Sequence, residues 1–259
     1  MILMVNERCV NLGFGRSFLR LMLEDGAEVV TEQELSAASA GEIDRSLERP
    51  IAKNLADYSG CRSVSILASD ITRPSPSHII LPPLVRRLKD LGVVDIRIVF
   101  GLGTHRKMTE EEMKLLLGGC IKLPHMQHDP GKCIHLGETR RGTPVEINRA
   151  VASSDLIIAT GNIEYHYYAG YSGGAKAVLP GVSSERSVVR NHELMRDPLS
   201  STGRLDSPVR LDMEDAAGVG GLDFILNVVL NGRNEIVQAV AGDYILAHRS
   251  GAATVDHIY

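Results

Sequence analysis

The sequence contains no tryptophan, and aromatic residues make up only 4% of its 259 positions. It also lacks a basic run: 28 lysines and arginines are outnumbered by 32 acidic residues, which leaves a net charge of −4. Binding to a nucleic-acid backbone needs a concentrated cationic face. We therefore expect no nucleic-acid partner. The few aromatic residues are unevenly placed, because four of the seven tyrosines gather in one stretch: Tyr165, Tyr167, Tyr168 and Tyr171.

Cysteine is scarce as well. The four cysteines are far apart and include no Cys-x-x-Cys pair, which argues against a zinc or disulfide framework and for a reducing compartment: Cys9, Cys61, Cys120 and Cys133. No run of about 18 apolar residues occurs, and the N-terminus lacks a basic start followed by a long apolar segment. We expect a cytoplasmic protein with no membrane partner.

The remaining composition, 44% hydrophobic and 23% charged, is ordinary for a folded protein and predicts neither disorder nor low complexity. A chain of this length can form one large α/β domain or two small ones, and it buries roughly three quarters of its extended surface. No internal repeat or long linker interrupts it.

Three short apolar runs, 63–68, 95–100 and 155–160, are typical of strands buried on both faces of a sheet. Helical periodicity separates the first two, starting near Ser77, and a further helix is predicted to open at Thr109. Strands alternating with helices favour a parallel sheet. The predicted fold is therefore α/β: a Rossmann-like layered domain with a largely parallel central sheet flanked by helices, plus a C-terminal β-hairpin and helix.

Other segments complete this prediction. Residues 17–23 alternate like a strand, with 27–31 as the expected partner, and 39–58 suits an amphipathic helix that is interrupted or bent near Pro50. A hairpin is expected from 134–136 and 144–147. The C-terminal hairpin pairs 224–230 with 235–240 around an Asn-Gly turn, and a helix follows from about Asp243.

Each of the three buried strands leads into a polar loop: DITRP at 70–74, GLGTHR at 101–106 and GNIEYH at 161–166. The carboxyl ends of parallel strands share one edge of a sheet, which is where ligands bind in α/β folds. We expect four side chains to converge there: Asp70, Arg73, His105 and His166.

A glycine-rich loop follows the third strand. Ser172, Gly173 and Gly174 precede Lys176, and paired glycines with a helix start after them suit a phosphate or carboxylate. The loop lacks the glycine before the lysine and the Ser or Thr after it that a P-loop ATPase needs. Ser183 or Ser184 is expected to cap the next helix, which runs to about Met195 and contains His192.

The composite of these motifs resembles the nickel-pincer-nucleotide enzymes typified by lactate racemase. The resemblance extends from about Ile43 to His248, and its most specific part is a run of spaced elements: His166, Gly170, Ser172-Gly173-Gly174, Lys176, Leu179-Pro180-Gly181 and Asn191-His192. Lys176 lies ten residues after His166 (176 − 166), and His192 sixteen after Lys176 (192 − 176).

The resemblance implies a role for each of these residues. It makes Lys176 the covalent carrier of a nickel pincer nucleotide, a nickel-bound pyridinium-3,5-dithiocarboxylate-type mononucleotide, and it makes His192 a nickel ligand. His166 becomes a catalytic acid/base, and Arg73 and His105 contribute to the substrate site. Because each hand of a substrate needs its own base, we hypothesise that His105 and His166 form the acid/base pair. The remaining residues assigned to the cofactor are Asp70, Thr72, Ser172, Gly173 and Gly174, of which Asp70 and Thr72 are expected near its ribose or phosphate.

Taken singly, these residues have plainer interpretations. His105 suits a loop histidine bonded to backbone, and Gly-x-Gly-x-x-Arg around it is a poor dinucleotide fingerprint. His192 suits a helix C-terminus, Arg73 a salt bridge with Asp70, and Lys176 a simple phosphate contact. The remaining histidines have no supporting constellation, and two of them, in His125-x-x-His128, are interpreted as structural; the others are His78, His135, His248 and His257.

The function implied by the resemblance is racemisation of a lactate-type 2-hydroxy acid by reversible hydride transfer. Its partners would be the hydroxy acid and the proteins that build the cofactor. Family members continue into a second α/β domain, which this sequence does not show, so we expect one domain over residues 1–259 and, as a further partner, a separate C-terminal domain. The alternatives are a non-catalytic module that binds a nucleotide or phosphate ligand, and an inactive fragment or half of a split racemase.

Overall fold

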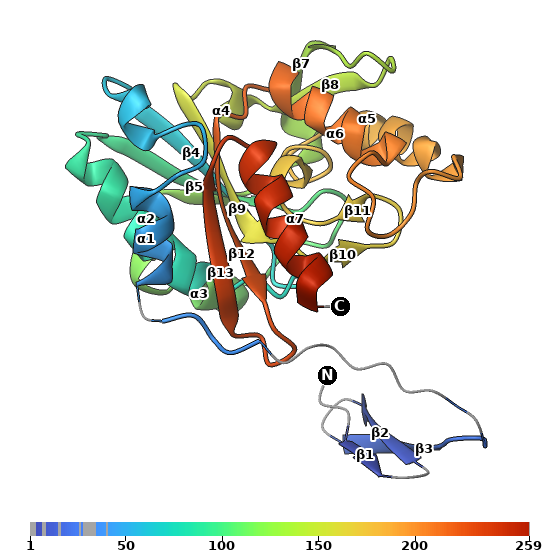
Figure 1. The fold of residues 1–259 in the computed structure, drawn as a ribbon. Helices are drawn as coiled ribbons and strands as arrows, with labels where there is room; N and C mark the ends of the chain where they lie inside the picture. Colours follow the sequence, from blue (N-terminus) through green and yellow to red (C-terminus); the bar gives the residue numbers. More distant parts are fainter. Residues whose placement is uncertain are drawn as a thin grey trace.

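The computed structural model describes residues 4–6, 9–14, 17–25, 27, 35–39 and 41–258. A six-stranded sheet in the order β13-β12-β9-β4-β5-β6 forms its centre (Figure 1). Neighbouring strands are parallel except for β12 and β13. The predicted α/β fold with a largely parallel sheet is confirmed. The strands are β4 (Ser63–Ser69), β5 (Asp95–Gly101), β6 (His125–Gln127), β9 (Leu156–Asn162), β12 (Phe224–Leu230) and β13 (Ile236–Gly242).

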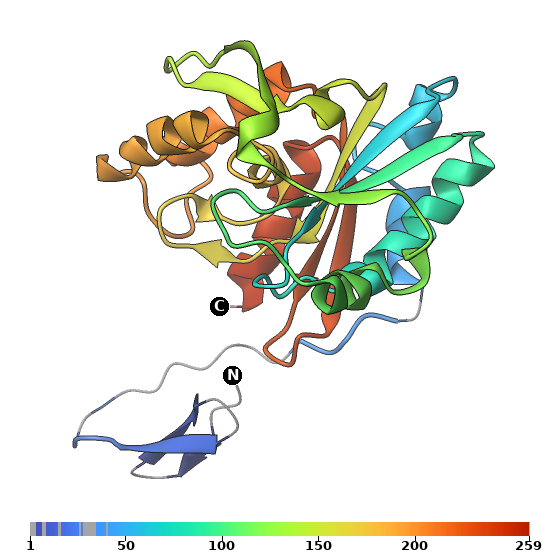
Figure 2. The ribbon, with the colours of Figure 1, turned by 180° about the vertical axis from the view of Figure 1, so that it is seen from behind.

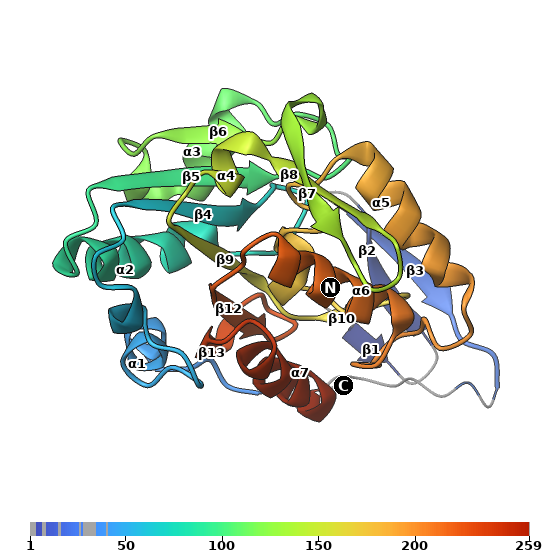
Figure 3. The same ribbon diagram turned by 90° about the horizontal axis from the view of Figure 1, so that it is seen from above.

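Helices cover both faces of the sheet (Figures 1, 2 and 3). Helices α1 (Glu42–Glu48), α2 (Ser77–Asp90) and α3 (Glu110–Leu117) contribute to one hydrophobic cluster. Those on the other face contribute to a second cluster: α4 (Arg149–Ala152), α5 (Glu185–His192), α6 (Pro208–Val219) and α7 (Leu246–Ile258). All seven residues of β9 are buried, because alternate side chains enter alternate clusters, as the apolar run predicts.

Helix α3 begins as its sequence predicts. The Thr109 hydroxyl accepts from the backbone N–H of Glu112 at 3.2 Å, and the Glu112 carboxylate accepts from the Thr109 N–H at 2.9 Å. This capping box satisfies two donors that would otherwise lack partners.

We expect Thr109→Ala to lower the free energy of unfolding by about 1 kcal/mol, because one helix N–H loses its acceptor. Urea denaturation measures the change. Thr109→Ser keeps the hydroxyl and serves as the control, so an equal loss in both variants would show that the cap is not the cause.

The helix predicted over 39–58 is interrupted near Pro50, which is one of the two outcomes expected there. Helix α1 ends at Glu48, and a separate 3-10 turn, η1 (Leu55–Tyr58), follows after Asn54. Between them Ile51 forms a parallel bridge with Gly242 and donates its backbone N–H to the Ala241 carbonyl at 2.8 Å. A residue whose backbone bonds are used by a sheet edge cannot also continue a helix.

The N-terminal strands form a sheet of their own, with β1 (Met4–Asn6), β2 (Cys9–Phe14) and β3 (Ser17–Met22) in antiparallel order. Strand β3 confirms the strand expected at 17–23 and pairs with β2. Residues 28–31 of its expected partner lie outside the described part of the chain.

Both predicted hairpins are confirmed. Strands β7 (Cys133–Glu138) and β8 (Pro144–Asn148) pair antiparallel, and so do β12 and β13. The second hairpin is part of the central sheet, because β12 also pairs with β9. Strand β6 and helix α6 have no counterpart in the sequence prediction. None of the helices in the described residues has the length and apolar character needed to cross a membrane.

Candidate active site

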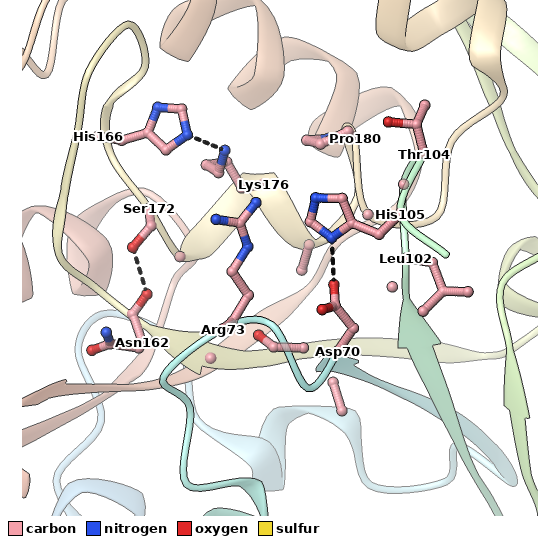
Figure 4. A pocket seen from close by; sticks show the side chains of 18 of the residues that line it. Asp70, Arg73, Leu102, Thr104, His105, Asn162, His166, Ser172, Lys176 and Pro180 are labelled. Carbon is pink, nitrogen blue, oxygen red and sulfur yellow. Dashed lines mark hydrogen bonds and ion pairs between the residues drawn. The ribbon is translucent and has the colours of Figure 1, made fainter. Parts of the chain in front are cut away.

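The loops after β4, β5 and β9 open on one cavity of about 340 Å³ (Figure 4). The structure brings to this cavity every site residue that the sequence predicted except Thr72 and Gly174, namely Asp70, Arg73, His105, His166, Ser172, Gly173, Lys176 and His192. The expected convergence at one edge of a parallel sheet therefore occurs.

Asp70 and His105 form a hydrogen-bonded pair. Nδ1 of His105 lies 2.9 Å from the Asp70 carboxylate, which also accepts from the Thr72 N–H at 2.8 Å and from its hydroxyl at 2.5 Å. Burial raises the pKa of Asp70, but these hydrogen bonds outweigh it and the net pKa is lowered. An ionised Asp70 only accepts, so Nδ1 of His105 donates and a neutral ring keeps its lone pair on Nε2. The contacts of Asp70 and Thr72 thus orient His105, a role that the sequence did not predict.

The guanidinium of Arg73 enters the cavity without a partner of its own. It is exposed, and no ion pair in the described residues includes it. The alternative in which Arg73 pairs with Asp70 is therefore not what the structure shows. A planar guanidinium that is free in this way can hold a carboxylate through two parallel hydrogen bonds.

His166 and Lys176 lie side by side, with Nε2 of the ring 3.1 Å from Nζ of the amine. Nδ1 of His166 accepts from the Ala169 N–H at 3.3 Å, so a neutral ring carries its proton on Nε2 and the amine accepts. Burial, followed by the charges of Arg210 and Arg73, lowers the pKa of Lys176 to about 7. Burial, followed by the charge of Lys176, also lowers the pKa of His166 far below its usual value. With a pKa of about 7, about half of the Lys176 amine is uncharged and nucleophilic at neutral pH.

Tyr168 packs between the two histidines of this side of the cavity. Its ring centroid lies 4.6 Å from that of His166 and 5.1 Å from that of His192, in edge-on contacts. The tyrosine is 8% exposed, and burial raises the pKa of its phenol to about 12. The cluster of tyrosines noted in the sequence thus supplies an uncharged wall for the site.

His192 is the last residue of α5, whose start is capped by the Ser184 hydroxyl as predicted. Nδ1 of His192 donates to the Val188 carbonyl at 2.8 Å, which leaves the lone pair of a neutral ring on Nε2. Burial is the main reason that its pKa is lowered. A half-buried neutral imidazole with one nitrogen fixed by a carbonyl, as His192 has here, is the usual state of a metal ligand. The predicted helix continues past His192 only as a 3-10 turn, η5 (Glu193–Arg196).

The donor set at the cavity does not form a metal site by itself. In the described ranges no three His, Cys, Asp or Glu side chains are grouped so that they could hold a metal ion. A metal bound through His192 would need further ligands that these side chains do not supply, and an organic group in the cavity could provide them. The wall also offers an unused acceptor, since Oδ1 of Asn162 is buried without a hydrogen-bond partner. The residues present therefore fit a metal that arrives within a polar cofactor.

The glycine-rich loop differs from the expected anion cradle. After Gly173 the chain forms only a four-residue 3-10 turn, η4 (Gly174–Ala177), so the helix start that the sequence predicted is not there. Gly174 has a φ of 56°, and a Cβ on it would lie 2.8 Å from the His248 ring. The close approach of His248, rather than a helix dipole, explains the glycine.

Three buried polar residues that the sequence analysis missed hold this loop. Asn227 of β12 accepts from the Gly174 N–H at 2.8 Å, and Nε2 of His248 donates to the Ser172 carbonyl at 2.8 Å. Arg210 of α6 donates to carbonyls of the same loop. His248, which had no supporting constellation in the sequence, therefore supports the site. These residues lie 37 to 76 positions from their partners, and no local motif marks them.

The two histidines of His125-x-x-His128 make backbone contacts. Nδ1 of His125 donates to the Leu123 carbonyl, and Nε2 of buried His128 donates to the Ser183 carbonyl, each at 2.9 Å. These bonds agree with their interpretation as structural residues.

Residues 14–203 match the family profile of the lactate racemase N-terminal domain. The chain belongs to this family. Two curated relatives, both lactate racemases, come from Lactiplantibacillus plantarum and Thermoanaerobacterium thermosaccharolyticum and are 37% and 36% identical over 227 residues. Each alignment covers 83% of this chain and 54% or 53% of the relative. The chain thus spans about half the length of these relatives.

Solved structures agree with the family assignment. The lactate racemase apoprotein from T. thermosaccharolyticum superposes with a TM-score of 0.86 at 34% identity, covering 96% of this chain and 62% of that one. A protein from Thermotoga maritima superposes with a TM-score of 0.72 at 21% identity, covering 88% of this chain and 61% of that one, which shows a shared fold.

Proposed function

We propose that this chain is the cofactor-holding catalytic domain of a racemase or epimerase that inverts a lactate-type 2-hydroxy acid. One observation carries the proposal: Arg73, His105, His166, Lys176 and His192 surround a single cavity in a member of the lactate racemase family. These five residues lie in separate loops and short elements, and none of them is in the central sheet. The fold therefore brings them together.

The residues fit a nickel pincer nucleotide. The uncharged amine of Lys176 would carry the cofactor covalently, and Nε2 of His192 would bind the nickel, because imidazole suits Ni(II). When bound, the cofactor would supply a reversible hydride acceptor next to the substrate. Ser172, Gly173 and Asn162 of the cavity wall would contact its polar groups.

The substrate's carboxylate would bind to Arg73, whose charge is not used elsewhere. Deprotonating the hydroxyl-bearing carbon directly is difficult, because that carbon is not acidic enough. In the proposed reaction the hydroxyl proton passes to a histidine while the hydrogen on carbon leaves as hydride, and a planar 2-keto acid results. Return of the hydride to the opposite face of the keto carbon, and of a proton to its oxygen, gives the other enantiomer.

Two bases are needed, one for each hand of the substrate. His105 presents the lone pair of Nε2, because Asp70 fixes the proton of a neutral ring on Nδ1. His166 carries its proton on Nε2 beside the Lys176 amine, so to act as a base it must change to the other tautomer and give up the 3.3 Å contact with the Ala169 N–H. In the view of Figure 4 the two rings lie on either side of Arg73 and Lys176. Covalent use of Lys176 would remove the amine that accepts from Nε2 of His166, which would favour the tautomer with its lone pair on Nε2, facing the substrate.

The same proposal implies two kinds of protein partner: the proteins that build the cofactor, and a domain equivalent to the other half of the relatives.

The proposed function is tested by intact mass and nickel analysis of the protein made in a host that synthesises the pincer nucleotide. We expect an adduct with stoichiometric nickel, both lost in Lys176→Ala. Lys122→Ala, at an exposed lysine away from the cavity, is the control and should keep both. Absence of adduct and nickel, in a host where a lactate racemase is loaded, would instead favour the non-catalytic ligand-binding module.

A further inference from the structure

Arg210 is an unusual residue for the interior of this domain. Its side chain is completely buried, and none of the ion pairs found in the described residues includes it. A buried charge without a partner is strongly destabilising, and an apolar side chain of similar volume would avoid that cost. The charge must therefore be stabilised in another way.

Backbone carbonyls of the glycine-rich loop surround the guanidinium. Nε donates to Ala169 and Nη1 to Gly173, each at 3.4 Å, while Nη2 donates to Ser172 at 3.4 Å and to Tyr171. One rigid, planar group thus binds four carbonyls within five consecutive residues, 169–173. Only a guanidinium has enough donors in a fixed plane for this arrangement.

This five-residue span separates the two reactive side chains of the site. His166 precedes it, and its Nδ1 accepts from Ala169, the first residue of the span. Lys176 follows it, and its N–H donates to the Gly173 carbonyl at 3.2 Å. Any change in the path of 169–173 would therefore move the amine relative to the imidazole.

We infer that Arg210 is a positioning residue, which fixes the path of residues 169–173 and so keeps Lys176 buried beside His166. The inference deepens the proposed function, since that function makes Lys176 the attachment point of the cofactor. The guanidinium also adds a positive charge near the amine. After burial, the charge of Arg210 is the largest cause that lowers the pKa of Lys176.

The reactivity of Lys176 with acetic anhydride tests the inference, because only an unprotonated amine is acetylated. The cofactor-free chain is labelled over a range of pH, and acetylation of Lys176 is followed by peptide mass analysis. In the unsubstituted chain we expect half-maximal labelling near pH 7, from the pKa of Lys176. In Arg210→Gln the amine gains water and loses a positive neighbour, so the midpoint should rise by about one pH unit or more.

Arg210→Lys is the conservative variant. It keeps a charge but offers an ammonium in place of the planar fork, so its midpoint should lie between those of the unsubstituted chain and Arg210→Gln. If Arg210→Gln does not fold, a raised midpoint in Arg210→Lys still supports the inference. An unchanged midpoint in a folded Arg210→Gln, or in Arg210→Lys, would overturn it.

Asp212→Asn is the matched control for a general loss of stability. Asp212 is also completely buried on α6, but it accepts from Thr139, Thr143 and Asn191 and does not contact residues 169–173. Asp212→Asn should lower the midpoint temperature of thermal unfolding without changing the pH at which labelling of Lys176 is half-maximal. An equal shift in Asp212→Asn would show that any loosening of α6 suffices, and would also overturn the inference.

The labelling requires neither nickel nor substrate, so the two proposals fail separately. If the chain takes up no cofactor but the Arg210 variants raise the labelling midpoint of Lys176, the positioning role stands and the racemase proposal fails. A chain that carries the Lys176 adduct but shows no shift would give the reverse result.

Discussion

Replacing His166 or His105 by glutamine is expected to slow racemisation by about 10²–10⁴-fold in the nickel-loaded protein, because each change removes one acid/base group. Glutamine approximates the size of imidazole but exchanges no proton near neutral pH. The adduct on Lys176 and the nickel content should stay unchanged, since neither histidine is assigned to carry them.

The two variants should differ in which enantiomer they still oxidise. Each retains the base for one hand of the substrate, so single-turnover quenching should release 2-keto acid from one enantiomer with His166→Gln and from the other with His105→Gln. Chiral analysis of the remaining hydroxy acid gives the same information. The double variant should release none from either.

His257→Gln is the control for these measurements. His257 is exposed on α7, away from the cavity, so its variant should racemise at the rate of the unsubstituted protein. If His166→Gln and His105→Gln both racemised as fast as this control, the two-base assignment would be refuted.

Gly170→Ala is expected to lower the free energy of unfolding by about 2–5 kcal/mol. Gly170 has a φ of 73°, where a side chain adds about 1–2 kcal/mol of strain. In addition, a Cβ there would overlap the carbonyl oxygen of Arg204, and relieving such an overlap by backbone movement costs about 1–3 kcal/mol. Because Gly170 pairs with His166 between β10 (Tyr165–His166) and β11 (Gly170–Tyr171), the movement should also displace the His166 ring.

Gly142→Ala provides a closely matched comparison for urea denaturation. Gly142 has a φ of 74°, but nothing lies within 4 Å of the position that its Cβ would take. It should show the strain alone, about 1–2 kcal/mol. If the two variants lost equal stability, crowding by Arg204 would not be the reason that glycine stands at position 170.

The local elements of this fold are largely readable from the sequence. The runs 63–68, 95–100 and 155–160 predict buried strands because their apolar side chains fit two hydrophobic clusters, one on each face. Thr109 and Ser184 predict helix starts because a side-chain oxygen satisfies a nearby N–H. Helix caps and apolar runs each involve residues that are close together along the chain, so a short stretch of sequence is enough to predict them.

Predictions failed where distant segments compete for the same backbone. Residues 39–58 predict a helix that is interrupted or bent near Pro50, but not that Ile51 bonds to Ala241 and Gly242 at the sheet edge. The loop before Lys176 has the glycines of an anion cradle, yet its conformation depends on Arg210, Asn227 and His248. Sequence spacing gives no sign of contacts that span tens of residues.

The sequence by itself determined the α/β fold and the reactive groups of the site, because parallel strands send their following loops to one edge whatever the details of packing. Only the tertiary structure decided how those groups are prepared for chemistry. It paired Asp70 with His105, left Arg73 without an ion pair among the described residues, and placed the half-buried Lys176 against His166 near the charge of Arg210. Protonation states depend on burial and on neighbouring charges, and both are set by residues that are close in space but remote along the chain.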